Sequence, residues 1–455
     1  MKITIIGAGP GGYETALAAA GKGVEVVLVS EGPLGGTCLN EGCIPTKSLC
    51  HVAEIKDAME GAESLGIAAS VSGIDMGKVQ ERKERIVSQL RGGVESLMKH
   101  RLITLVYGKG WLKDGHTVLV ETAEGTREFI SDAVILATGS VSASLPIEGA
   151  DLCITSREIL QLDRAPRRLA VIGGGVIGLE FASIFRSFGS AVTVVEFCKN
   201  ILPRFDDDLS KRLKQSLSKR GIAIETSATV QRVVRTGEGL EVTYLQKGET
   251  CAVVADEVLM AVGRRPNLAS LNLDEAGIDY DARGVKVNAY MQTNLPSVYA
   301  VGDLTGGMML AHAATFQGRR ALDHLLAGQP VEGAVDSIDF GIVPAAVFTR
   351  PEAAMVGRTE EECKEQGIAS RSLKSFFRAN GKAVSMDEPE GFCKLVVAAG
   401  DGRILGCHLF GAHAADLVQE VAALMNRQAT LADFQAVIHA HPTLGEVLQA
   451  AAHSA

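Results

Sequence analysis

Apolar residues in this chain gather into short runs that alternate with stretches of helical spacing. Lys2–Ile6 and Val24–Val29 are short apolar runs typical of buried strands, and the alanine-rich stretch Gly12–Ala20 between them is typical of a helix. A strand, a helix and a second strand in this order predict a βαβ unit and therefore a parallel sheet. The same pattern returns later in the chain, at Leu169–Ile172, Gly178–Phe188 and Ala191–Val195.

The rest of the chain follows other patterns. Residues 75–100 are charged, with apolar positions at helical spacing, which predicts a long amphipathic helix. β-rich stretches come next, at Leu102–Val106, Thr117–Glu121 and Val134–Ala137. Residues 336–455 combine strand-like segments with late helical runs, at Ala345–Thr349, Phe392–Val397, Ile404–Leu409, Ala414–Met425 and Thr443–Ala452. The chain is therefore expected to be an α/β protein with two Rossmann-like domains and a C-terminal α+β domain.

Composition narrows the class of protein. Hydrophobic residues make up 46% and charged residues 22% of the 455 residues, which allows a large core and argues against disorder. The net charge of −9 lacks the basic footprint of a nucleic-acid-binding protein. Nine scattered cysteines favour a reducing compartment over a secreted disulfide framework. Without a long apolar run we expect no membrane span, and without a recognisable presequence we expect a cytoplasmic protein or a mature form already processed.

A glycine-rich turn follows the first strand of each of the two βαβ units. Each has the pattern G-x-G-x-x-G, with glycines at Gly7, Gly9 and Gly12 and at Gly173, Gly175 and Gly178. The first glycine permits a tight turn, the second lets the backbone approach a pyrophosphate, and the third lets helix and strand pack closely. The helix N-terminus then presents N–H groups to the phosphates. An ordinary strand-to-helix turn is the alternative, but the strand–turn–helix–strand context favours two dinucleotide sites.

The acidic residue after the second strand of each unit bears on the choice of cofactor. Glu196 ends the second strand of the later unit, where a carboxylate binds a ribose 2′-hydroxyl and repels a 2′-phosphate. NAD is therefore favoured over NADP, although Lys199 lies nearby. In the first unit Ser30 or Glu31 could reach the ribose, and we favour Glu31. Two dinucleotide sites in one chain indicate two cofactors that exchange electrons, and the usual partner of NAD is a flavin, here FAD.

Cys38 and Cys43 are the most informative pair of residues. Five residues of regular helix rise about 7.5 Å, which exceeds the usual disulfide Cα separation of roughly 4.4–6.8 Å. A bridge therefore requires a distorted turn, for which Gly42 supplies backbone freedom and Pro45 disfavours a helical Ile44. A metal site and a pair of inert core thiols are the alternatives, but neither a second cysteine pair nor a His cluster is nearby. The position just after a dinucleotide unit favours a redox disulfide.

The segment GGTCLNEGCIPTK at residues 35–47 resembles the active-site motif of the dihydrolipoamide dehydrogenases, a group within the pyridine nucleotide–disulfide oxidoreductases. Further stretches of the chain resemble the same family, at residues 137–139, 263–267, 293–303 and 347–352. The resemblance implies an FAD-binding domain at residues 1–145 and 275–335, an NAD-binding domain at 146–274 and a dimerisation domain at 336–455. It also implies further cofactor contacts: Thr138, Gly139, Asp303 and Ala311 for FAD, and Gly263 for NAD.

The resemblance assigns the remaining catalytic residues. His441 would be the acid–base residue and Glu446 would orient it, as a carboxylate partner orients the histidine of a nucleophilic triad. His439 is interpreted as structural. Lys47 would lie by the flavin and pair with Glu180, with a plain surface salt bridge as the alternative. In related proteins the histidine reaches the disulfide of the other subunit, which implies an obligate homodimer with composite sites.

The implied activity is the oxidation of protein-bound dihydrolipoamide with reduction of NAD, and the implied partner is the lipoylated carrier domain of a 2-oxoacid dehydrogenase or glycine-cleavage complex. Glutathione reductase and mercuric reductase share the plan. Glu196 argues against an NADP-dependent glutathione reductase, and the C-terminus lacks the cysteine pair of mercuric reductase. A non-catalytic flavin redox sensor is the remaining alternative. No metal is expected.

Overall fold

The computed structural model describes residues 1–327 and 338–454, and the chain divides into two compact units. Unit 1 comprises residues 1–48, 78–143 and 263–338, and unit 2 comprises residues 49–77, 144–262 and 339–455. The predicted limit between residues 335 and 336 lies outside the described residues. No helix in the described ranges combines the length and the apolar character that a membrane crossing requires.

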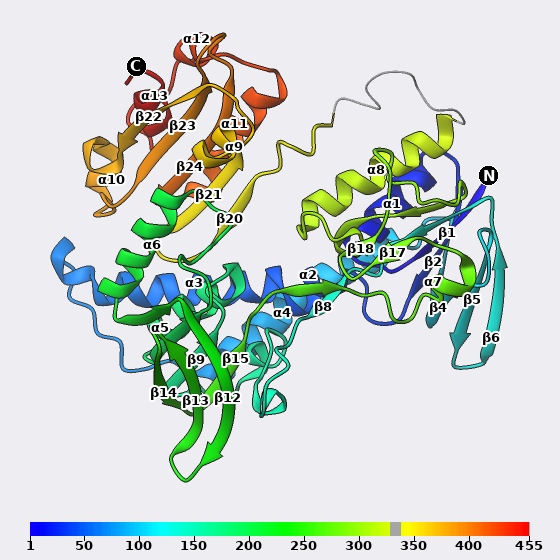
Figure 1. Cartoon of the computed structure of the whole chain (residues 1–455), viewed down its shortest axis with the longest axis horizontal. Helices are drawn as coiled ribbons and strands as arrows, with labels where there is room; N and C mark the ends of the chain where they lie inside the picture. The colour runs from blue at the N-terminus through cyan, green and yellow to red at the C-terminus, as the bar shows by residue number, and fades with distance from the viewer. Residues whose placement is uncertain (328–337, 455) are drawn as a thin grey trace. The chain divides into compact units, whose positions relative to one another are not determined.

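A five-stranded parallel sheet forms the centre of unit 1 (Figure 1). Its strands lie in the order β19 (Val298–Ala300), β7 (Ala133–Leu136), β1 (Lys2–Ile6), β2 (Glu25–Ser30) and β3 (Ile103–Tyr107). β1 pairs in parallel with both β2 and β7, and the side chains of Ile3 and Ile5 are fully buried. Because strands buried on both faces need apolar side chains throughout, the short continuous apolar runs of the sequence fit this sheet.

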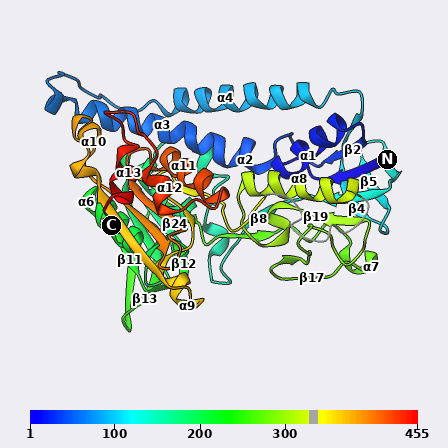
Figure 2. The same ribbon diagram turned by 90° about the horizontal axis from the view of Figure 1, so that it is seen from above.

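Helices and smaller sheets complete unit 1. Helix α1 (Pro10–Gly21) packs closely on α8 (Ala311–Ala327), where Gly318 leaves no room for a Cβ beside Thr15. The amphipathic segment forms the long helix α4 (Met76–Leu97), seen in Figure 2. The smaller sheets are β4 (Lys109–Leu112), β5 (Thr117–Thr122) and β6 (Gly125–Ile130), then β8 (Ser140–Ser142) with β16 (Arg264–Pro266), and β17 (Tyr280–Asp281) with β18 (Gly284–Val285).

Unit 2 contains the second parallel sheet. Its strands lie in the order β11 (Ile222–Thr226), β10 (Ala191–Glu196), β9 (Arg168–Ile172) and β15 (Glu257–Met260). Helix α5 (Val176–Ser187) connects β9 to β10, and α6 (Asp207–Lys219) connects β10 to β11. An antiparallel sheet lies beside it, formed by β12 (Ala228–Thr236), β13 (Gly239–Gln246) and β14 (Glu249–Ala255). The repeated βαβ unit is thus confirmed.

The C-terminal part of unit 2 is an antiparallel sheet with helices packed on it. The strands lie in the order β20 (Ala345–Val347), β21 (Glu352–Gly357), β24 (Ile404–Gly411), β23 (Phe392–Ala398) and β22 (Ser370–Phe376). The helices are α9 (Glu360–Glu365), α10 (Gly381–Ser385), α11 (Ala414–Asn426), α12 (Leu431–Gln435) and α13 (Glu446–Ala452). The α+β prediction and the α/β class are confirmed. Two predicted elements are shorter than expected, because β20 ends at Val347 and α13 begins only at Glu446.

Candidate active site

The two cysteines of the motif flank a break between two helices in unit 1. Helix α2 (Gly36–Glu41) ends before Gly42, and α3 (Cys43–Glu60) begins directly after it. Gly42 has φ −143° and ψ −109°, which is far from helical, and its carbonyl accepts hydrogen bonds from the backbone and hydroxyl of Thr46 at 3.0 and 2.6 Å. The predicted distortion is therefore present, but at Gly42 only. Ile44 is helical, because Pro45 lies in the first turn, where its missing N–H is not needed.

Cys38 and Cys43 lie close enough to interact as thiols. Cys38 is half-buried and Cys43 is exposed. A side-chain hydrogen bond with Cys43, followed by burial, raises the pKa of the Cys38 thiol far above its ordinary value, while the charge of Lys47 acts in the opposite direction. Two sulfurs at hydrogen-bond range on either side of a flexible glycine can form the bridge that a regular helix would forbid.

The glycines of the first turn have three different environments. Gly7 has φ +111°, and a Cβ there would lie 2.2 Å from the carbonyl oxygen of Ala137. A Cβ on Gly12 would lie 1.8 Å from the oxygen of Gly7, so the third glycine serves helix–strand packing. A Cβ on Gly9 would approach nothing closer than 3.9 Å. Gly9 therefore faces a space next to the α1 N-terminus that a phosphate group fits.

The second turn repeats this arrangement in unit 2. Gly173 has φ +110°, and a Cβ on Gly178 would lie 2.1 Å from the oxygen of Gly173. A Cβ on Gly175 would meet no atom within 4 Å. Gly175 is also the N-cap of α5, and its extended backbone leaves the first N–H groups of the helix pointing outward. Both turns thus have the shape that a dinucleotide pyrophosphate requires.

The carboxylate of Glu196 supports the second turn directly. It is buried, and it accepts hydrogen bonds from the backbone N–H of Gly174 at 2.5 Å and of Cys198 at 2.6 Å. In unit 1, the hydroxyl of Ser30 is buried and donates to the carbonyl of Gly32 at 2.8 Å, whereas Glu31 is exposed. The different exposure of the two residues favours Glu31 for contact with a ribose.

A hydrogen-bonded group surrounds Asp303, in the short 3₁₀ helix Gly302–Thr305. The hydroxyl of Ser140 donates to Asp303 Oδ2 at 2.5 Å, and Arg264 donates from Nε to that hydroxyl and from Nη2 to the carbonyl of Ser140, both at 2.7 Å. Arg264 Nε lies 4.0 Å from Asp303 Oδ2. Burial lowers the pKa of Arg264, and the charges of Asp303, Cys43 and Glu41 counteract this.

Sequence reasoning missed Ser140 and Arg264, although each directly follows a residue that it named. Gly139 and Gly263 both have positive φ, at 70° and 111°, in the segments that lead into β8 and β16. The segment before β8 is bonded to the residue after β16, because the hydroxyl of Thr138 donates to the carbonyl of Asn267 at 3.1 Å and the N–H of Asn267 donates to the carbonyl of Gly139 at 2.9 Å. The structure thus places Thr138 and Gly139 beside Asn267, whereas Gly263 lies at the other end of the antiparallel β8–β16 pair, where its carbonyl accepts a hydrogen bond from the N–H of Ala143 at 3.0 Å. Ala311 is the first residue of α8.

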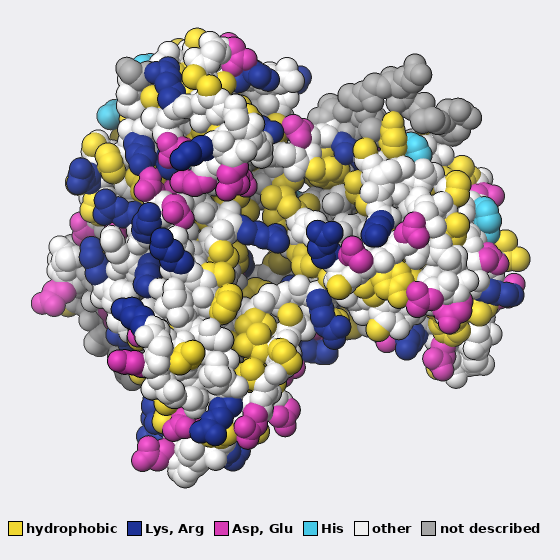
Figure 3. Space-filling view, viewed as in Figure 1, with side chains coloured by type: hydrophobic (Ala, Val, Ile, Leu, Met, Phe, Trp, Pro, Cys, Tyr) yellow, Lys and Arg dark blue, Asp and Glu magenta, His cyan; other side chains and the backbone are white. Residues whose placement is uncertain are grey.

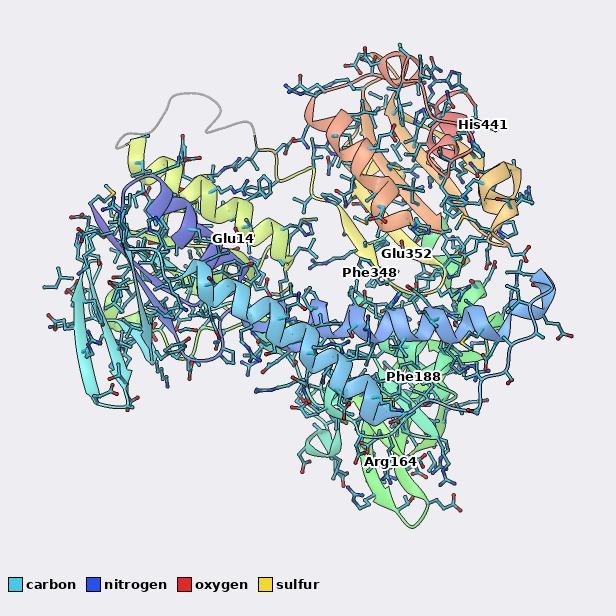
Figure 4. The ribbon with its side chains drawn as sticks, turned by 180° about the vertical axis from the view of Figure 1, so that it is seen from behind. Glu14, Arg164, Phe188, Phe348, Glu352 and His441 are labelled. Atoms are coloured by element: carbon cyan, nitrogen blue, oxygen red, sulfur yellow. The ribbon has the colours of Figure 1, made fainter. Side chains whose placement is uncertain are left out.

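His441 and Glu446 form a pair in unit 2, and His441 lies on the outer edge of the C-terminal α+β region (Figure 4). Nδ1 of His441 lies 2.9 Å from Oε1 of Glu446, and the N–H of Thr443 donates to Oε2 at 2.8 Å. The hydrogen bonds from His441 and Thr443 lower the pKa of Glu446. The imidazole is 78% exposed, so its other nitrogen can meet a reactant. By contrast, His439 is buried and bonds to Glu420 at 2.9 Å.

Lys47 and Glu180 belong to different units, so their pairing stays a prediction. Lys47 lies in α3 of unit 1, near Cys38. Glu180 is buried in α5 of unit 2, and its Oε1 accepts a hydrogen bond at 3.0 Å from the N–H of Phe348, just after β20 (Figure 4). This contact fixes the Glu180 carboxylate within unit 2.

Known proteins resemble the chain over nearly its whole length. Dihydrolipoyl dehydrogenases of Geobacillus stearothermophilus and Bacillus subtilis are each 38% identical to it, over 99% of this chain and 95% of their own. Among solved structures, LpdA from Mycobacterium tuberculosis has a TM-score of 0.90 at 29% identity and covers 99% of both chains. The HOCl-induced flavoprotein disulfide reductase RclA of Escherichia coli has a TM-score of 0.86 at 28% identity, again with 99% of both chains covered.

Two family profiles match the chain. Residues 343–452 match the dimerisation domain of the pyridine nucleotide-disulphide oxidoreductases, which supports a homodimer. Residues 1–318 match the pyridine nucleotide-disulphide oxidoreductase profile itself. Together with the cysteine pair and the two glycine turns, these matches show that the chain belongs to the pyridine nucleotide-disulphide oxidoreductases, a family of enzymes that use FAD and NAD(H).

Proposed function

We propose that the protein oxidises dihydrolipoamide to lipoamide and reduces NAD⁺ to NADH, through a redox disulfide between Cys38 and Cys43. The close thiol pair at the α2–α3 break carries this proposal. Relatives named dihydrolipoyl dehydrogenase, 37–38% identical over nearly the whole chain, support the choice of substrate. The carboxylate of Glu196 supports NAD over NADP, because it would repel a 2′-phosphate.

Thiol–disulfide exchange needs a thiolate nucleophile. In the proposed reaction, His441 removes a proton from a dihydrolipoamide thiol, and the resulting thiolate attacks the sulfur of Cys38. The Cys38–Cys43 bond breaks, and Cys43 leaves as a thiolate. The second substrate thiol then attacks the first sulfur and its proton passes to the sulfur of Cys38, which closes the dithiolane and releases Cys38 as a thiol. The enzyme has gained the two electrons that the substrate has lost, and bound FAD supplies the route by which they reach NAD⁺ as a hydride.

The exposed imidazole of His441 fits the role of base. Its Nδ1 is engaged by Glu446, which fixes the ring and stabilises the imidazolium that forms after proton transfer. As in related proteins, His441 of one subunit would serve the disulfide of the other, so each complete site would need the homodimer.

We infer the cofactor contacts from the two glycine motifs and from the resemblance to the family. Gly7, Gly9 and Gly12 would hold the FAD pyrophosphate, and Glu31 its ribose. Thr138, Gly139, Asp303 and Ala311 would line the rest of the FAD site. Gly173, Gly175, Gly178, Glu196 and Gly263 would bind NAD. Lys47, placed near the cysteines, would stabilise negative charge that develops on the flavin when it is reduced.

The substrate would be delivered by a protein. A lipoylated carrier domain of a 2-oxoacid dehydrogenase or glycine-cleavage complex is the proposed partner. The C-terminal region that carries His441 would then face the carrier when the lipoyl group enters the site.

The test is turnover of the purified homodimer with dihydrolipoamide and NAD⁺, compared with NADP⁺ and with glutathione as reductant. Cys38→Ser and Cys43→Ser should each lower kcat by at least about 10³-fold, because a single thiol cannot complete the exchange. FAD should stay bound in both variants. Cys251→Ser, on β14 and away from both turns in sequence, is the matched control and should keep full activity. Substantial activity in both motif variants, or a preference for glutathione with NADP⁺, would reject the proposal.

A further inference from the structure

A fully buried lysine lies in the C-terminal region of unit 2. Lys394 is on β23, and its side chain is 1% exposed. Its ammonium donates to Asp206 at 2.7 Å and to Asp208 at 3.2 Å, and it also pairs with Glu360. Although burial disfavours the charged form, the hydrogen bonds to Asp206 and Glu360 raise the pKa of Lys394. A buried charge of this kind persists only where its partners are fixed.

The three carboxylates that contact Lys394 come from two different parts of unit 2. Glu360 begins α9 of the C-terminal region, whereas Asp206 and Asp208 begin α6 of the NAD-type region. On the face of unit 2 that carries α6 and α9, acidic and basic side chains lie side by side (Figure 3). Lys394 therefore joins the start of α6 to the antiparallel sheet.

Asp206 uses its two oxygens for two tasks. Oδ1 accepts hydrogen bonds from the N–H groups of Asp208 and Leu209, at 3.0 and 3.2 Å, and so caps α6. Oδ2 receives the ammonium of Lys394. Because Asp206 is fully buried, loss of Lys394 would leave its charge without its closest cation.

The segment before Asp206 touches the second glycine turn. The N–H of Leu202 donates to the carbonyl of Gly174 at 2.9 Å, and the N–H of Phe205 donates back to Leu202 at 2.8 Å. Leu202 has φ +48°, a left-handed conformation that costs a leucine energy and persists only where its surroundings hold it. Asp206 lies four residues on and is fully buried, and helix α6, which it caps, contacts this segment through the hydroxyl of Ser210, which donates to the carbonyl of Leu202 at 3.3 Å.

Gly174 is thereby fixed on both sides of its α-carbon. Its N–H is bonded to Glu196 and its carbonyl to Leu202. Gly174 lies between Gly173 and Gly175, so its orientation sets the direction of the turn that faces the pyrophosphate. We propose that Lys394 is a positioning residue for NAD, which acts from the dimerisation domain through Asp206 and Leu202 on the turn Gly173–Gly178. This inference rests on the proposed NAD site.

The chain offers a matched control. Lys374 lies opposite Lys394 in the register of β22 and β23, and it also binds Asp208, at 2.7 Å. Its side chain is 41% exposed and makes no contact with Asp206 among the described residues. Lys374→Met removes a lysine from the same network without freeing the buried carboxylate.

The experiment measures NAD⁺ binding to the oxidised FAD-loaded homodimer by titration calorimetry. Lys394→Met should raise the Kd for NAD⁺ about tenfold or more, and Lys374→Met should change it less than about twofold. FAD content and KM for dihydrolipoamide should stay at the wild-type value in both variants, which separates positioning of NAD from general damage. Asp206→Asn keeps a cap on α6 but removes the charge, so it should raise Kd even if Lys394→Met does not fold.

The outcomes separate two failures. If wild-type protein binds NAD⁺ but Asp206→Asn binds it equally well, or if the two lysine variants have the same Kd, Lys394 has no positioning role. If wild-type protein does not bind NAD⁺ at all, the NAD assignment of the turn fails, and this inference fails with it.

Discussion

Nδ1 of His441 lies 2.9 Å from Oε1 of Glu446, and the second carboxylate oxygen is held by the N–H of Thr443. These hydrogen bonds lower the pKa of Glu446. The Glu446 carboxylate is therefore ionised and paired with His441 at any pH above that lowered pKa, and the pair is lost only as the pH falls through it. We therefore expect no loss of orientation of the imidazole between about pH 5 and 9, since an ordinary glutamate titrates near 4.3. Any change in the rate of dihydrolipoamide oxidation in that pH range should come from groups other than Glu446.

Glu446→Gln tests the pair. The amide can still fix the ring but cannot stabilise the imidazolium, so kcat/KM for dihydrolipoamide should fall about 10²-fold, within the usual range for a general base. The pH profile of kcat/KM for wild type and variant is the measurement. Glu420→Gln, which disturbs buried His439 instead, is the control and should lower stability more than kcat. Equal kinetic effects from the two variants would contradict a catalytic role for the His441–Glu446 pair.

Ser140 and Asp303 provide a second prediction. Both contacts that Asp303 makes through its carboxylate fall on Oδ2, from Ser140 and Arg264, among the described residues. Oδ1 can therefore accept a hydroxyl of the flavin side chain. Asp303→Asn should weaken FAD binding by about tenfold or more, because it loses a charge-assisted hydrogen bond. Ser140→Ala should do so by a smaller factor, since it only releases the orientation of the carboxylate.

The measurement is the Kd of FAD, obtained by titrating the apoprotein with FAD and following the change in fluorescence that flavin binding causes. Ser142→Ala, two residues along the same strand, is the control for Ser140→Ala. If Asp303→Asn and Ser142→Ala bind FAD equally well, Asp303 does not contact the cofactor.

The local parts of the site could be predicted from the sequence, because they depend on near neighbours. The two glycine turns were located since a tight turn with φ near +110° needs glycine at Gly7 and Gly173. The break at Gly42 was expected because glycine gives the backbone the freedom to leave the helical conformation, as its φ of −143° and ψ of −109° show. The prediction for Ile44 was wrong, because the non-helical preference of a residue before proline is weaker than the stabilisation of the 18-residue helix α3.

Long-range side-chain contacts could not be predicted in this way. Ser140 and Asp303 are 163 residues apart, and Lys394 and Asp206 are 188 apart. No periodicity or spacing links residues at such separations, so only the folded chain shows that they bond. His441 and Glu446 were predicted from the resemblance to a known family. In the structure, a short turn brings the two side chains together.

Glu196 provides a third prediction, on cofactor choice. Its carboxylate supports Gly174 and would bind the ribose in the proposed NAD site, so Glu196→Ser should both weaken NAD⁺ binding and reduce the bias against NADP⁺. We expect KM for NAD⁺ to rise about tenfold, and the ratio of kcat/KM for NAD⁺ over NADP⁺ to fall at least tenfold. Steady-state assays with both nucleotides measure this. Lys199→Ala is the control for the nearby cation. If it, rather than Glu196→Ser, changes the ratio, Glu196 does not select the cofactor.

Two glycine-to-alanine substitutions should have opposite effects on stability. A Cβ on Gly318 of α8 would lie 1.9 Å from the Thr15 hydroxyl oxygen and 3.1 Å from the carbonyl oxygen of Gly11, both on α1. Gly318→Ala should therefore force α1 and α8 apart and lower the free energy of unfolding by about 1–3 kcal/mol. Gly92 lies within α4, is exposed and would place its Cβ in open space. Gly92→Ala should raise the free energy of unfolding by about 0.5–1 kcal/mol, because alanine favours a helix over glycine.

The comparison is made by denaturant unfolding of the FAD-loaded protein, with activity measured alongside. The two variants carry the same substitution, so a difference in sign isolates the space around each glycine. Because α1 begins at the first glycine turn, which we propose binds FAD, Gly318→Ala should also speed the loss of FAD, whereas Gly92→Ala should not. Equal stability of Gly318→Ala and wild type would mean that α1 and α8 can separate without cost, which the close contact at Thr15 argues against.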